Sequence, residues 1–230
     1  MSNPSQQPLR RTGSGLTDVG RKRQSNEDAF FFDDRLGLYI VGDGMGGHAR
    51  GEVASQLTLQ TIASIYQRDA KPILPDPARF LEESVLAAHR ELHRYRAEHS
   101  LPEAPRTTLV ACIVQQGVAI WAHVGDSRLY LIRGGRILER TIDHSRVHHL
   151  VQSGLIRPED AKDHPERNRI FNCIGAYVAP TVEVSRPFAM RNGDTMLLCS
   201  DGLWGALNDR QIAEAFTQVL ASGAVSLAKK

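Results

Sequence analysis

Apolar residues near the start of the chain fall into two short runs, EDAFFFDD (27–34) and LGLYIVGD (36–43). Runs of this length, rich in aromatic and β-branched residues, predict strands, and the short gap between them predicts an antiparallel pair joined by a tight turn. From residue 48 to residue 68 the apolar positions recur every four residues, which indicates a helix. A second helix is predicted after Asp76, a suitable N-cap residue, with Pro77 at the first helical position.

The rest of the chain continues with short strands and few helices. Residues 141–177 stand apart because they are polar and rich in His and Arg. Strands that follow one another without a helix between them favour antiparallel meanders over parallel βαβ units. We therefore predict an α+β fold in which helices flank antiparallel strands. The remaining predicted elements are, in order, strands at 107–115, 118–126 and 127–137 with a turn at Gly134-Gly135, a short helix near 145–153, strands at 181–188 and 195–201, and a helix from about Asn208.

The size and composition of the chain indicate one globular domain. Its 230 residues, 41% of them hydrophobic and 23% charged, are ordinary for such a domain. Residues 1–14 are polar and rich in Pro, Ser and Gln, so we predict a disordered tail followed by one domain over 15–230. The formal charge of +2, from 28 basic and 26 acidic residues, gives no electrostatic case for nucleic-acid binding.

Cysteines and apolar segments indicate where the protein resides. Cys112, Cys173 and Cys199 are odd in number and far apart, which favours free thiols in a reducing compartment. The longest apolar region, 107–125, is interrupted by polar residues and is too broken to span a bilayer. We therefore predict a cytoplasmic protein with no membrane partner.

Acidic residues occur where the predicted apolar strands begin or end. Clustered carboxylates are costly unless a positive charge neutralises them, and an oxygen-ligated divalent ion such as Mg²⁺ or Mn²⁺ is the usual solution. The glycines after Asp43 and Asp201 let the backbone turn sharply there. Taken one at a time, Asp-Gly pairs are ordinary turn residues, whereas the whole set favours a metal site. The set is Glu27, Asp28, Asp43, Asp126 and Asp201.

The glycine-rich stretch VGDGMGGH (41–48) has a second interpretation, a loop whose backbone N–H groups bind phosphate. The P-loop motif needs a Lys for the phosphates and a Ser or Thr for Mg²⁺, and His-Ala-Arg stands after these glycines instead. A dinucleotide-binding loop needs a parallel βαβ unit, which the strand pattern does not provide. The sequence therefore disfavours nucleotide binding at this loop.

Six motifs follow one another along the chain: GRKRQSNEDA (20–29), DGMGGH (43–48), GEVAS (51–55), HVGDSRLY (123–130), DHS (143–145) and LLCSDGL (197–203). Together they resemble the bacterial branch of the metal-dependent serine/threonine protein phosphatases, type 2C. The resemblance runs from about Thr17 to about Ala221. It implies a four-layer α-β-β-α sandwich of two antiparallel sheets flanked by helices, with a metal centre at one rim. It also implies a flap-like segment at 141–177 beside the site.

The resemblance implies a ligand set for two ions, Mn²⁺ or Mg²⁺. Asp43 would bridge the two ions, and the Gly44 carbonyl would be a further ligand. Asp201 would bind one of the ions. Glu27 and Asp28 would act partly through metal-bound waters.

The resemblance gives two more residues a role. Asp126 matches the position of a third, weaker metal site. Arg23 would hold the substrate phosphate, and its bidentate fork suits a phosphoryl dianion. A water bridging the two ions would attack phosphorus without a phosphoenzyme. His48 is the candidate acid for the leaving alkoxide, and a substrate contact or a helix-start residue are its alternatives.

The implied activity is hydrolysis of phosphoserine and phosphothreonine on proteins phosphorylated by a serine/threonine kinase, carried out by a monomer. One feature departs from the family. Its members continue past a helix like 209–222 into an Asp-Asn pair and a last strand, whereas no Asp or Asn follows Asp209 here. We therefore expect the last strand and one metal ligand to be missing. The alternative function is a catalytically weak or inactive phosphatase-like binding module.

Other histidines are given less specific expectations. His89 and His93 lie four residues apart on a predicted helix and lack the H-E-x-x-H order of a zinc site, so we expect them on a solvated helix face. His144, His148 and His149 lie in the flap-like segment, where surface positions and substrate contacts both stay open.

Overall fold

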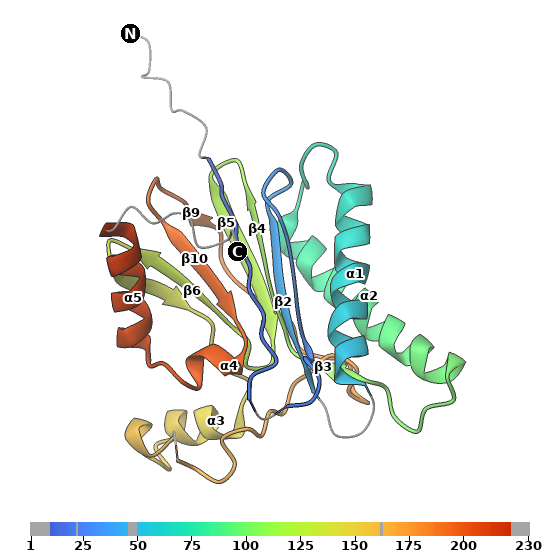
Figure 1. Ribbon diagram of the computed structural model, residues 1–230. Coiled ribbons are helices and arrows are strands. Elements are labelled where there is room, and N and C mark those ends of the chain that lie inside the picture. The colour runs from blue at the N-terminus through green and yellow to red at the C-terminus, as the bar shows by residue number, and fades with distance from the viewer. Residues whose placement is uncertain (1–9, 22, 46–49, 162, 222–230) are drawn as a thin grey trace.

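The structure is a computed structural model that describes residues 10–21, 23–45, 50–161 and 163–221. These residues form four layers, with two β-sheets face to face and helices on both outer sides (Figure 1). Helices α1 (Gly51–Asp69) and α2 (Pro77–Glu98) cover the larger sheet, and α5 (Asp209–Ala221) covers the smaller one. The predicted α-β-β-α sandwich is confirmed.

Short strands make up both sheets, and every strand pair among the described residues is antiparallel. The larger sheet has the order β1-β2-β4-β5-β8, with β3 paired to β2 and β9 paired to β5, and the smaller has the order β10-β6-β7. The strands are β1 (Asp28–Asp33), β2 (Leu38–Met45), β3 (Arg106–Thr107), β4 (Leu109–Gln115), β5 (Val118–Val124), β6 (Arg128–Arg133), β7 (Arg136–Arg140), β8 (Glu183–Val184), β9 (Phe188–Ala189) and β10 (Thr195–Cys199).

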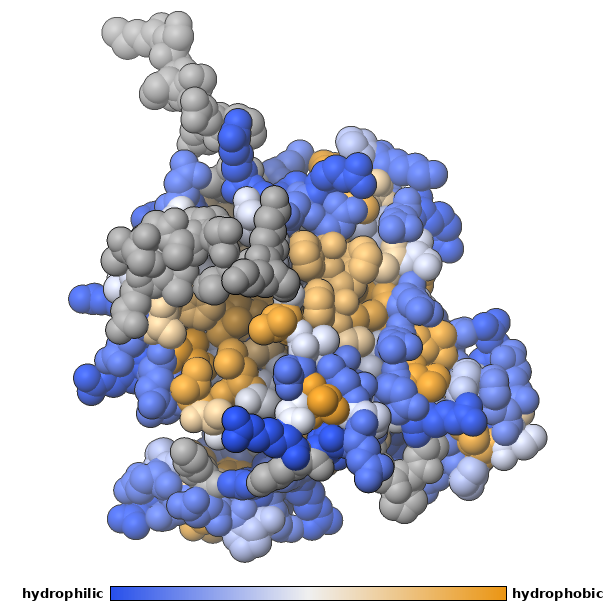
Figure 2. Space-filling model, in the orientation of Figure 1, coloured by the Kyte–Doolittle hydropathy of each residue, from blue (hydrophilic) through white to orange (hydrophobic). Residues whose placement is uncertain are grey.

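Three shorter helical elements lie at one end of the sandwich: α3 (Arg146–Gln152), η1 (Pro158–Ala161) and α4 (Asp201–Trp204). The first two belong to the 141–177 segment, which hangs below the two sheets in Figure 1. On the face shown in Figure 2, apolar residues gather in the middle of the molecule, over the strands, while the lower end is hydrophilic. This polar end is where the carboxylates predicted from the sequence come together.

The core has three parts, one between each pair of neighbouring layers. Between the sheets, Cys112 and Trp121 of the larger sheet pack with Leu129 and Leu131 of the smaller. A second cluster fills the space between the larger sheet and the helices α1 and α2. The third lies between the smaller sheet and α5, where Ile212 is 1% exposed. Successive side chains of a strand point to opposite faces of its sheet, so each sheet contributes to the core between the sheets and to the core beneath its helices.

Side chains at the first residues fix where two helices begin. Asp76 caps α2, because its carboxylate accepts from the Arg79 N–H at 3.0 Å, as predicted. At α5 the Asn208 side chain accepts from the Gln211 N–H at 2.9 Å, and the Gln211 side chain accepts from the Asn208 N–H at 3.0 Å. This reciprocal pair is a capping box.

The strand predicted over 181–188 is interrupted in the structure. It forms two separate two-residue strands, β8 and β9. Between them the Ser185 hydroxyl, and not a backbone carbonyl, accepts the hydrogen bond from β5. The Trp121 N–H donates to the Ser185 hydroxyl at 3.0 Å, while the Ser185 N–H donates to the Trp121 carbonyl at 2.8 Å. Pro187 follows and has no N–H to continue the pairing.

The predicted tail over residues 1–14 is described only from residue 10. Arg11 donates from its guanidinium to the carbonyls of Val114 and Arg35. The Gly13 N–H donates to the Asp34 carboxylate at 2.8 Å. Arg11 and Gly13 are therefore bonded to the larger sheet and its first turn, and residues 1–9 lie outside the described part.

Two sequence predictions concern the cysteines and membrane spans. All three cysteines are free; Cys112 and Cys199 are buried and Cys173 is partly buried. Within the described ranges, none of the helices is both long enough and apolar enough to cross a bilayer.

Candidate metal centre

Asp43 lies on the face of β2 that points between the two sheets. Side chains along a strand alternate between faces, so Tyr39, Val41 and Asp43 share one face of β2. Tyr39 and Val41 pack against the core between the sheets. The Asp43 carboxylate therefore stands at the end of that core, at the rim near α4 and the 141–177 segment.

Carboxylates from distant segments lie beside Asp43. Asp28 on β1 is its partner across the antiparallel ladder. The Ser200 hydroxyl donates to the Asp28 carboxylate at 2.7 Å, which joins the end of β10 to the start of β1. The prediction that Asp201 ends a strand was wrong: β10 ends at Cys199, Ser200 is an extended residue at the N-cap position, and Asp201 is the first residue of α4.

These carboxylates act on one another electrostatically. Burial, followed by the charges of Asp28, Asp201 and Asp126, raises the pKa of Asp43 from 3.8 to about 8. Burial, followed by the charges of Asp143 and Asp201, raises the pKa of Asp126 to about 7. Burial and Asp28 also raise the pKa of Asp201. Four predicted acidic residues, far apart in the sequence, therefore share one electrostatic environment.

The donor set suits a hard divalent cation. Like charges held together in a buried place disfavour ionisation, and a divalent ion at the same place reverses that penalty. Oxygen ligands are those that Mg²⁺ and Mn²⁺ prefer. Asp28, Asp43, Asp126 and Asp201 offer only oxygens, so the residues present fit such ions.

Glu27 and Gly44 pack tightly at the start of α1. The Gly44 N–H donates to the Glu27 carbonyl at 3.0 Å, and the Ser55 hydroxyl on α1 donates to the same carbonyl at 2.6 Å. A Cβ at Gly44 would lie 2.1 Å from the Gly51 carbonyl oxygen, so only glycine fits there. The Glu27 carboxylate lies close to Gly51 at the first turn of α1.

Arg23 lies on the solvent side of the carboxylates. Its guanidinium is 3.7 Å from the Glu27 carboxylate, and its side chain is 73% exposed. Its charge also lowers the pKa of Asp201, against the larger effect of burial. The predicted phosphate-binding residue is therefore brought to the acidic site with its charged end open to solvent. His48, the candidate acid, lies outside the described residues.

Two buried threonines that the sequence analysis missed hold the Asp43 backbone. The Thr107 hydroxyl and the Thr108 N–H both donate to the Asp43 carbonyl at 2.9 Å. The Asp43 N–H donates to the Thr108 hydroxyl at 3.2 Å, and that hydroxyl is 2.7 Å from the Ser127 hydroxyl beside Asp126. Their one signal in the sequence is a pair of polar residues at the start of an apolar strand.

A second set of side chains holds the backbone of Asp126. The Trp204 indole N–H donates to the Asp126 carbonyl at 2.9 Å. The Arg128 guanidinium stacks 3.8 Å from the centre of the Trp204 ring and donates twice to the Asp143 carboxylate, at 2.7 and 2.5 Å. Arg128 and Asp143 both belong to quoted motifs, but their pairing across 15 residues is invisible in the sequence.

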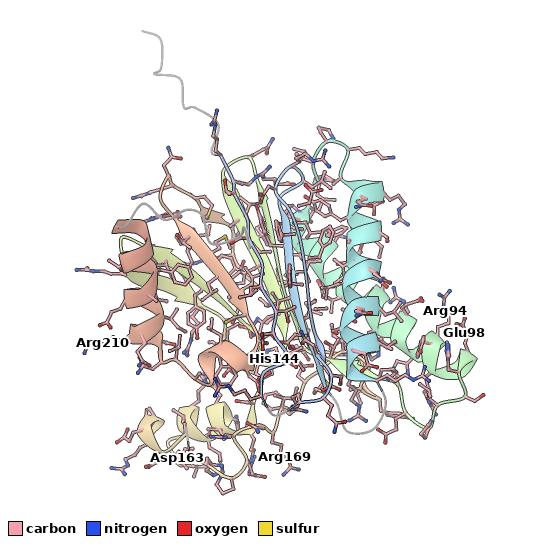
Figure 3. The ribbon with its side chains drawn as sticks, in the orientation of Figure 1. Arg94, Glu98, His144, Asp163, Arg169 and Arg210 are labelled. Carbon is pink, nitrogen blue, oxygen red and sulfur yellow. The ribbon has the colours of Figure 1, made fainter. Side chains whose placement is uncertain are left out.

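The 141–177 segment faces the acidic site and carries a groove of about 540 Å³. The charge of Arg167 lowers the pKa of Asp201, against the larger effect of burial, so the two groups are near one another. Arg169 pairs with Glu166 at 2.6 Å and points away from the sheets in Figure 3. The groove is lined by Arg146, His149, Glu166, Arg169, Ile170 and Phe171.

The prediction of a solvated face for His89 and His93 was wrong. His89 is 8% exposed and its Nδ1 accepts from the Gly175 N–H at 3.1 Å. His93 Nε2 lies 2.9 Å from the Ala176 carbonyl oxygen. The end of the 141–177 segment covers this face of α2, and the sequence does not reveal a contact across more than eighty residues.

A two-sheet sandwich with buried carboxylates and an exposed arginine at one rim defines a candidate metal-dependent hydrolase of anionic substrates. The family described as Protein phosphatase 2C matches residues 19–229. The chain therefore belongs to the protein phosphatase 2C family, and it is a protein serine/threonine phosphatase.

Relatives and solved structures agree with this family. The chain is 35% identical over 205 residues to "Serine/threonine phosphatase stp" of Listeria innocua, covering 86% of this chain and 80% of the relative. It is 31% identical over 208 residues to "Protein phosphatase PhpP" of Streptococcus pneumoniae, covering 88% and 82%. The crystal structure of the Mycobacterium tuberculosis serine/threonine phosphatase PstP/Ppp has a TM-score of 0.75 and 36% identity, covering 86% of this chain and 81% of that one.

One similar structure contains metal ions. The catalytic domain of the phosphatase PstP, solved in complex with two manganese ions, has a TM-score of 0.73 and 33% identity. The superposition covers 90% of this chain and 88% of that one.

Proposed function

We propose that this chain hydrolyses phosphoserine and phosphothreonine on proteins with two Mn²⁺ or Mg²⁺ ions held at the rim of the sandwich. The observation that carries the proposal is the shared environment of the carboxylates, in which burial, followed by the charges of Asp28, Asp201 and Asp126, raises the pKa of Asp43 to about 8. The relatives are named as phosphatases, and nothing in the described site favours the inactive alternative. The proposed ligands are Asp43, the Gly44 carbonyl, Asp201, Glu27 and Asp28, with Asp126 for a third ion.

The ions would supply Lewis acidity and a water of lowered pKa, so that hydroxide is available near neutral pH. The residues of the chain orient the reaction. The exposed guanidinium of Arg23 binds the phosphoryl oxygens and offsets their growing charge. Thr107 and Thr108 hold the Asp43 backbone, so its carboxylate keeps one position during turnover. His48 is the proposed donor of a proton to the leaving oxygen.

The proposed substrates are proteins phosphorylated by a serine/threonine kinase. The groove on the 141–177 segment combines cationic and apolar side chains, which suits a peptide that flanks a phosphorylated residue. The charge of Arg167, in the same segment, lowers the pKa of Asp201 against the larger effect of burial. This supports a position of the flap-like segment beside the proposed metal ligands. We further propose that the chain acts as a monomer in the cytoplasm, where its free cysteines suit a reducing environment.

The test compares wild-type protein with Asp43→Asn on a phosphothreonine peptide in Mn²⁺. Because Asn keeps the shape but loses the negative charge, we expect phosphate release to fall by about 10²-fold or more. Asp69→Asn is the matched control, because Asp69 is exposed at the far end of α1 and pairs with Arg68. Phosphate release by wild-type protein in excess EDTA, or by Asp43→Asn at the wild-type rate, would contradict the metal mechanism.

A further inference from the structure

The ring of His144 stacks on another histidine and both of its nitrogens have hydrogen-bond partners. The His144 side chain is 12% exposed, so of the two interpretations left open for this residue the surface position does not hold. The ring stacks on His123 with centroids 4.6 Å apart. Figure 3 shows His144 between the two sheets, at the end of the sandwich that faces α3. The residue thus lies where the larger sheet, the rim and the 141–177 segment meet.

The backbone and the side chain of His144 both bond to Gly125, the residue before Asp126. The His144 N–H donates to the Gly125 carbonyl at 2.9 Å. In return the Gly125 N–H donates to His144 Nδ1 at 3.1 Å. Gly125 has a φ of +99°, a conformation that the chain adopts easily only at glycine. The turn that leads into Asp126 is therefore held from one side by two hydrogen bonds from a single residue.

The 141–177 segment bonds to the same histidine. The Phe171 N–H donates to the His144 carbonyl at 3.0 Å, and Asn172 Nδ2 is 2.8 Å from His144 Nδ1. The orientation of the Asn172 amide is fixed, since its oxygen accepts from the Thr181 N–H and its nitrogen donates to the Thr181 carbonyl. Nδ1 of His144 therefore accepts from two N–H donors.

This pattern decides which nitrogen of His144 carries the proton. With two donors facing Nδ1, the proton of the neutral ring is on Nε2, which lies 3.2 Å from the Glu183 carboxylate. His123 Nε2 faces the carbonyl of Ile142 at 2.7 Å and also carries its proton. Burial lowers the pKa of His123, which keeps that ring neutral.

A metal site at this place is thereby disfavoured. The ligand atoms of His123, His144 and Glu183 lie within 4.8 Å of one another, the one such group among the described residues. A metal-bound imidazole needs its lone pair toward the ion and its other N–H toward an acceptor. In both histidines the nitrogen that faces Glu183 carries a proton, so the cluster is a hydrogen-bonded unit.

We propose that His144 is a positioning residue for the phosphatase reaction: its Nδ1, as an acceptor, holds the Gly125–Asp126 turn in the geometry that the acidic site needs. The proposal rests on the proposed role of Asp126 as a metal ligand. Trp204 bonds to the Asp126 carbonyl, which follows the Asp126 side chain in the backbone as Gly125 precedes it. With His144 in place, the backbone on both sides of the Asp126 side chain is fixed before any ion or substrate binds.

The test separates the role of Nδ1, the acceptor, from the role of Nε2, which donates to Glu183. In His144→Asn the side-chain oxygen can take the place of Nδ1, whereas in His144→Gln the longer amide can reach Glu183 as Nε2 does. Both variants and His144→Ala are assayed with para-nitrophenyl phosphate over a range of Mn²⁺ concentrations. Melting temperatures measured alongside check that each variant is folded.

We expect His144→Ala and His144→Gln to lower kcat by about tenfold and to raise the Mn²⁺ concentration for half-maximal activity by about fivefold, with KM nearly unchanged, because one hydrogen bond beside a charged site is lost. His144→Asn should keep both values within about twofold of the wild type. Glu183→Gln is the matched control, since its amide oxygen still accepts from Nε2, and it should behave as wild type. If His144→Ala does not fold, the comparison of Asn with Gln is sufficient.

Three outcomes would overturn the proposal. Rescue by Gln but not by Asn would assign the role to the contact between Nε2 and Glu183. Equal loss of activity in all three variants would assign the role of His144 to ring stacking. Wild-type activity in all three would show that His144 has no positioning role. An inactive wild-type protein in Mn²⁺ would instead count against the proposed function, so the two failures are distinguishable.

Discussion

Asp43 is held by its backbone, and its carboxylate faces other carboxylates. Its N–H and carbonyl bond to Thr107 and Thr108, two residues that are at most 1% exposed. A carboxylate in such a place is costly in the absence of a cation, because burial and like charges both oppose ionisation. Rigid backbone support keeps the side chain there despite that cost.

The hydroxyl of Thr108 provides a test of this support. In Thr108→Val the shape is kept, but the Asp43 N–H and the Ser127 hydroxyl lose their partner. Leaving such buried groups unpaired should lower the free energy of unfolding by about 1–3 kcal/mol, as measured by urea unfolding. The expected effect on activity is a reduced kcat in Mn²⁺, since Asp43 loses one of its fixed bonds.

Thr108→Ser is the matched control for that variant. It keeps the hydroxyl and loses only a methyl group, so its unfolding free energy should lie clearly closer to wild type than that of Thr108→Val. Equal losses in both variants would show that packing of the methyl group, and not the hydrogen bonds, gives Thr108 its importance.

Among the elements, the two Asp-Gly pairs differ although the sequence treats them alike. Gly44 lies in β2 against the first turn of α1, and a Cβ there would overlap the Gly51 carbonyl at 2.1 Å. Gly202 lies in α4, where a Cβ would meet only the Ser200 hydroxyl at 3.7 Å. The need for glycine at Gly44 therefore comes from packing between a strand and a helix, and at Gly202 no such need exists.

The contrast predicts opposite results for two alanine substitutions. Gly44→Ala must displace the start of α1 and should lower the unfolding free energy by about 1–3 kcal/mol or more, as overpacking does. Gly202→Ala should leave stability unchanged or raise it by up to about 1 kcal/mol, because alanine favours a helix. Thermal and urea unfolding of the two variants provide the measurement, and equal stability of both variants would contradict the packing argument.

Element types could be predicted because the apolar periods of strands and helices differ. The β1–β2 pair and the start of α2 at Asp76 follow directly from such patterns. The break between β8 and β9 could not be predicted, because it depends on Ser185 bonding to Trp121 on a strand 64 residues earlier. Local patterns give the elements, and side chains from elsewhere decide where those elements stop.

In the whole molecule, the acidic site is assembled from segments that the sequence keeps apart. The carboxylates themselves could be predicted, because each stands at the start or the end of an apolar run within a recognisable motif. Their supporting residues could not be predicted. Thr108, Trp204 and His144 acquire their roles only when the two sheets close against each other and the 141–177 segment folds over one end.

The raised pKa values predict how the stability of the metal-free protein depends on pH. The folded-state pKa of Asp43 is raised to about 8 and that of Asp126 to about 7, whereas in the unfolded chain both are near 3.8. Between these limits the folded state binds more protons, so its stability falls as the pH rises from about 4 to about 8. Added Mn²⁺ should reduce this fall.

The measurement is urea unfolding of wild-type protein and Asp43→Asn in EDTA, from pH 5 to pH 8. His123 has the opposite effect, since burial lowers its pKa, but it is present in both proteins and cancels in their difference. The stability of wild type relative to Asp43→Asn should decrease steadily over this range. A constant or increasing difference in unfolding free energy would show that Asp43 does not have a raised pKa in the folded protein.

The three consecutive residues Asp143, His144 and Ser145 each bond to a different part of the fold. Asp143 binds Arg128 in the smaller sheet, His144 binds the turn before Asp126, and the Ser145 hydroxyl accepts from the His148 N–H at the start of α3. Inserting or deleting a single residue here would move all three contacts out of register together. Changes of chain length in homologous proteins should therefore be excluded from this tripeptide and be tolerated in the exposed loop near Gly154, where a Cβ added to the glycine would meet no other atom within 4 Å.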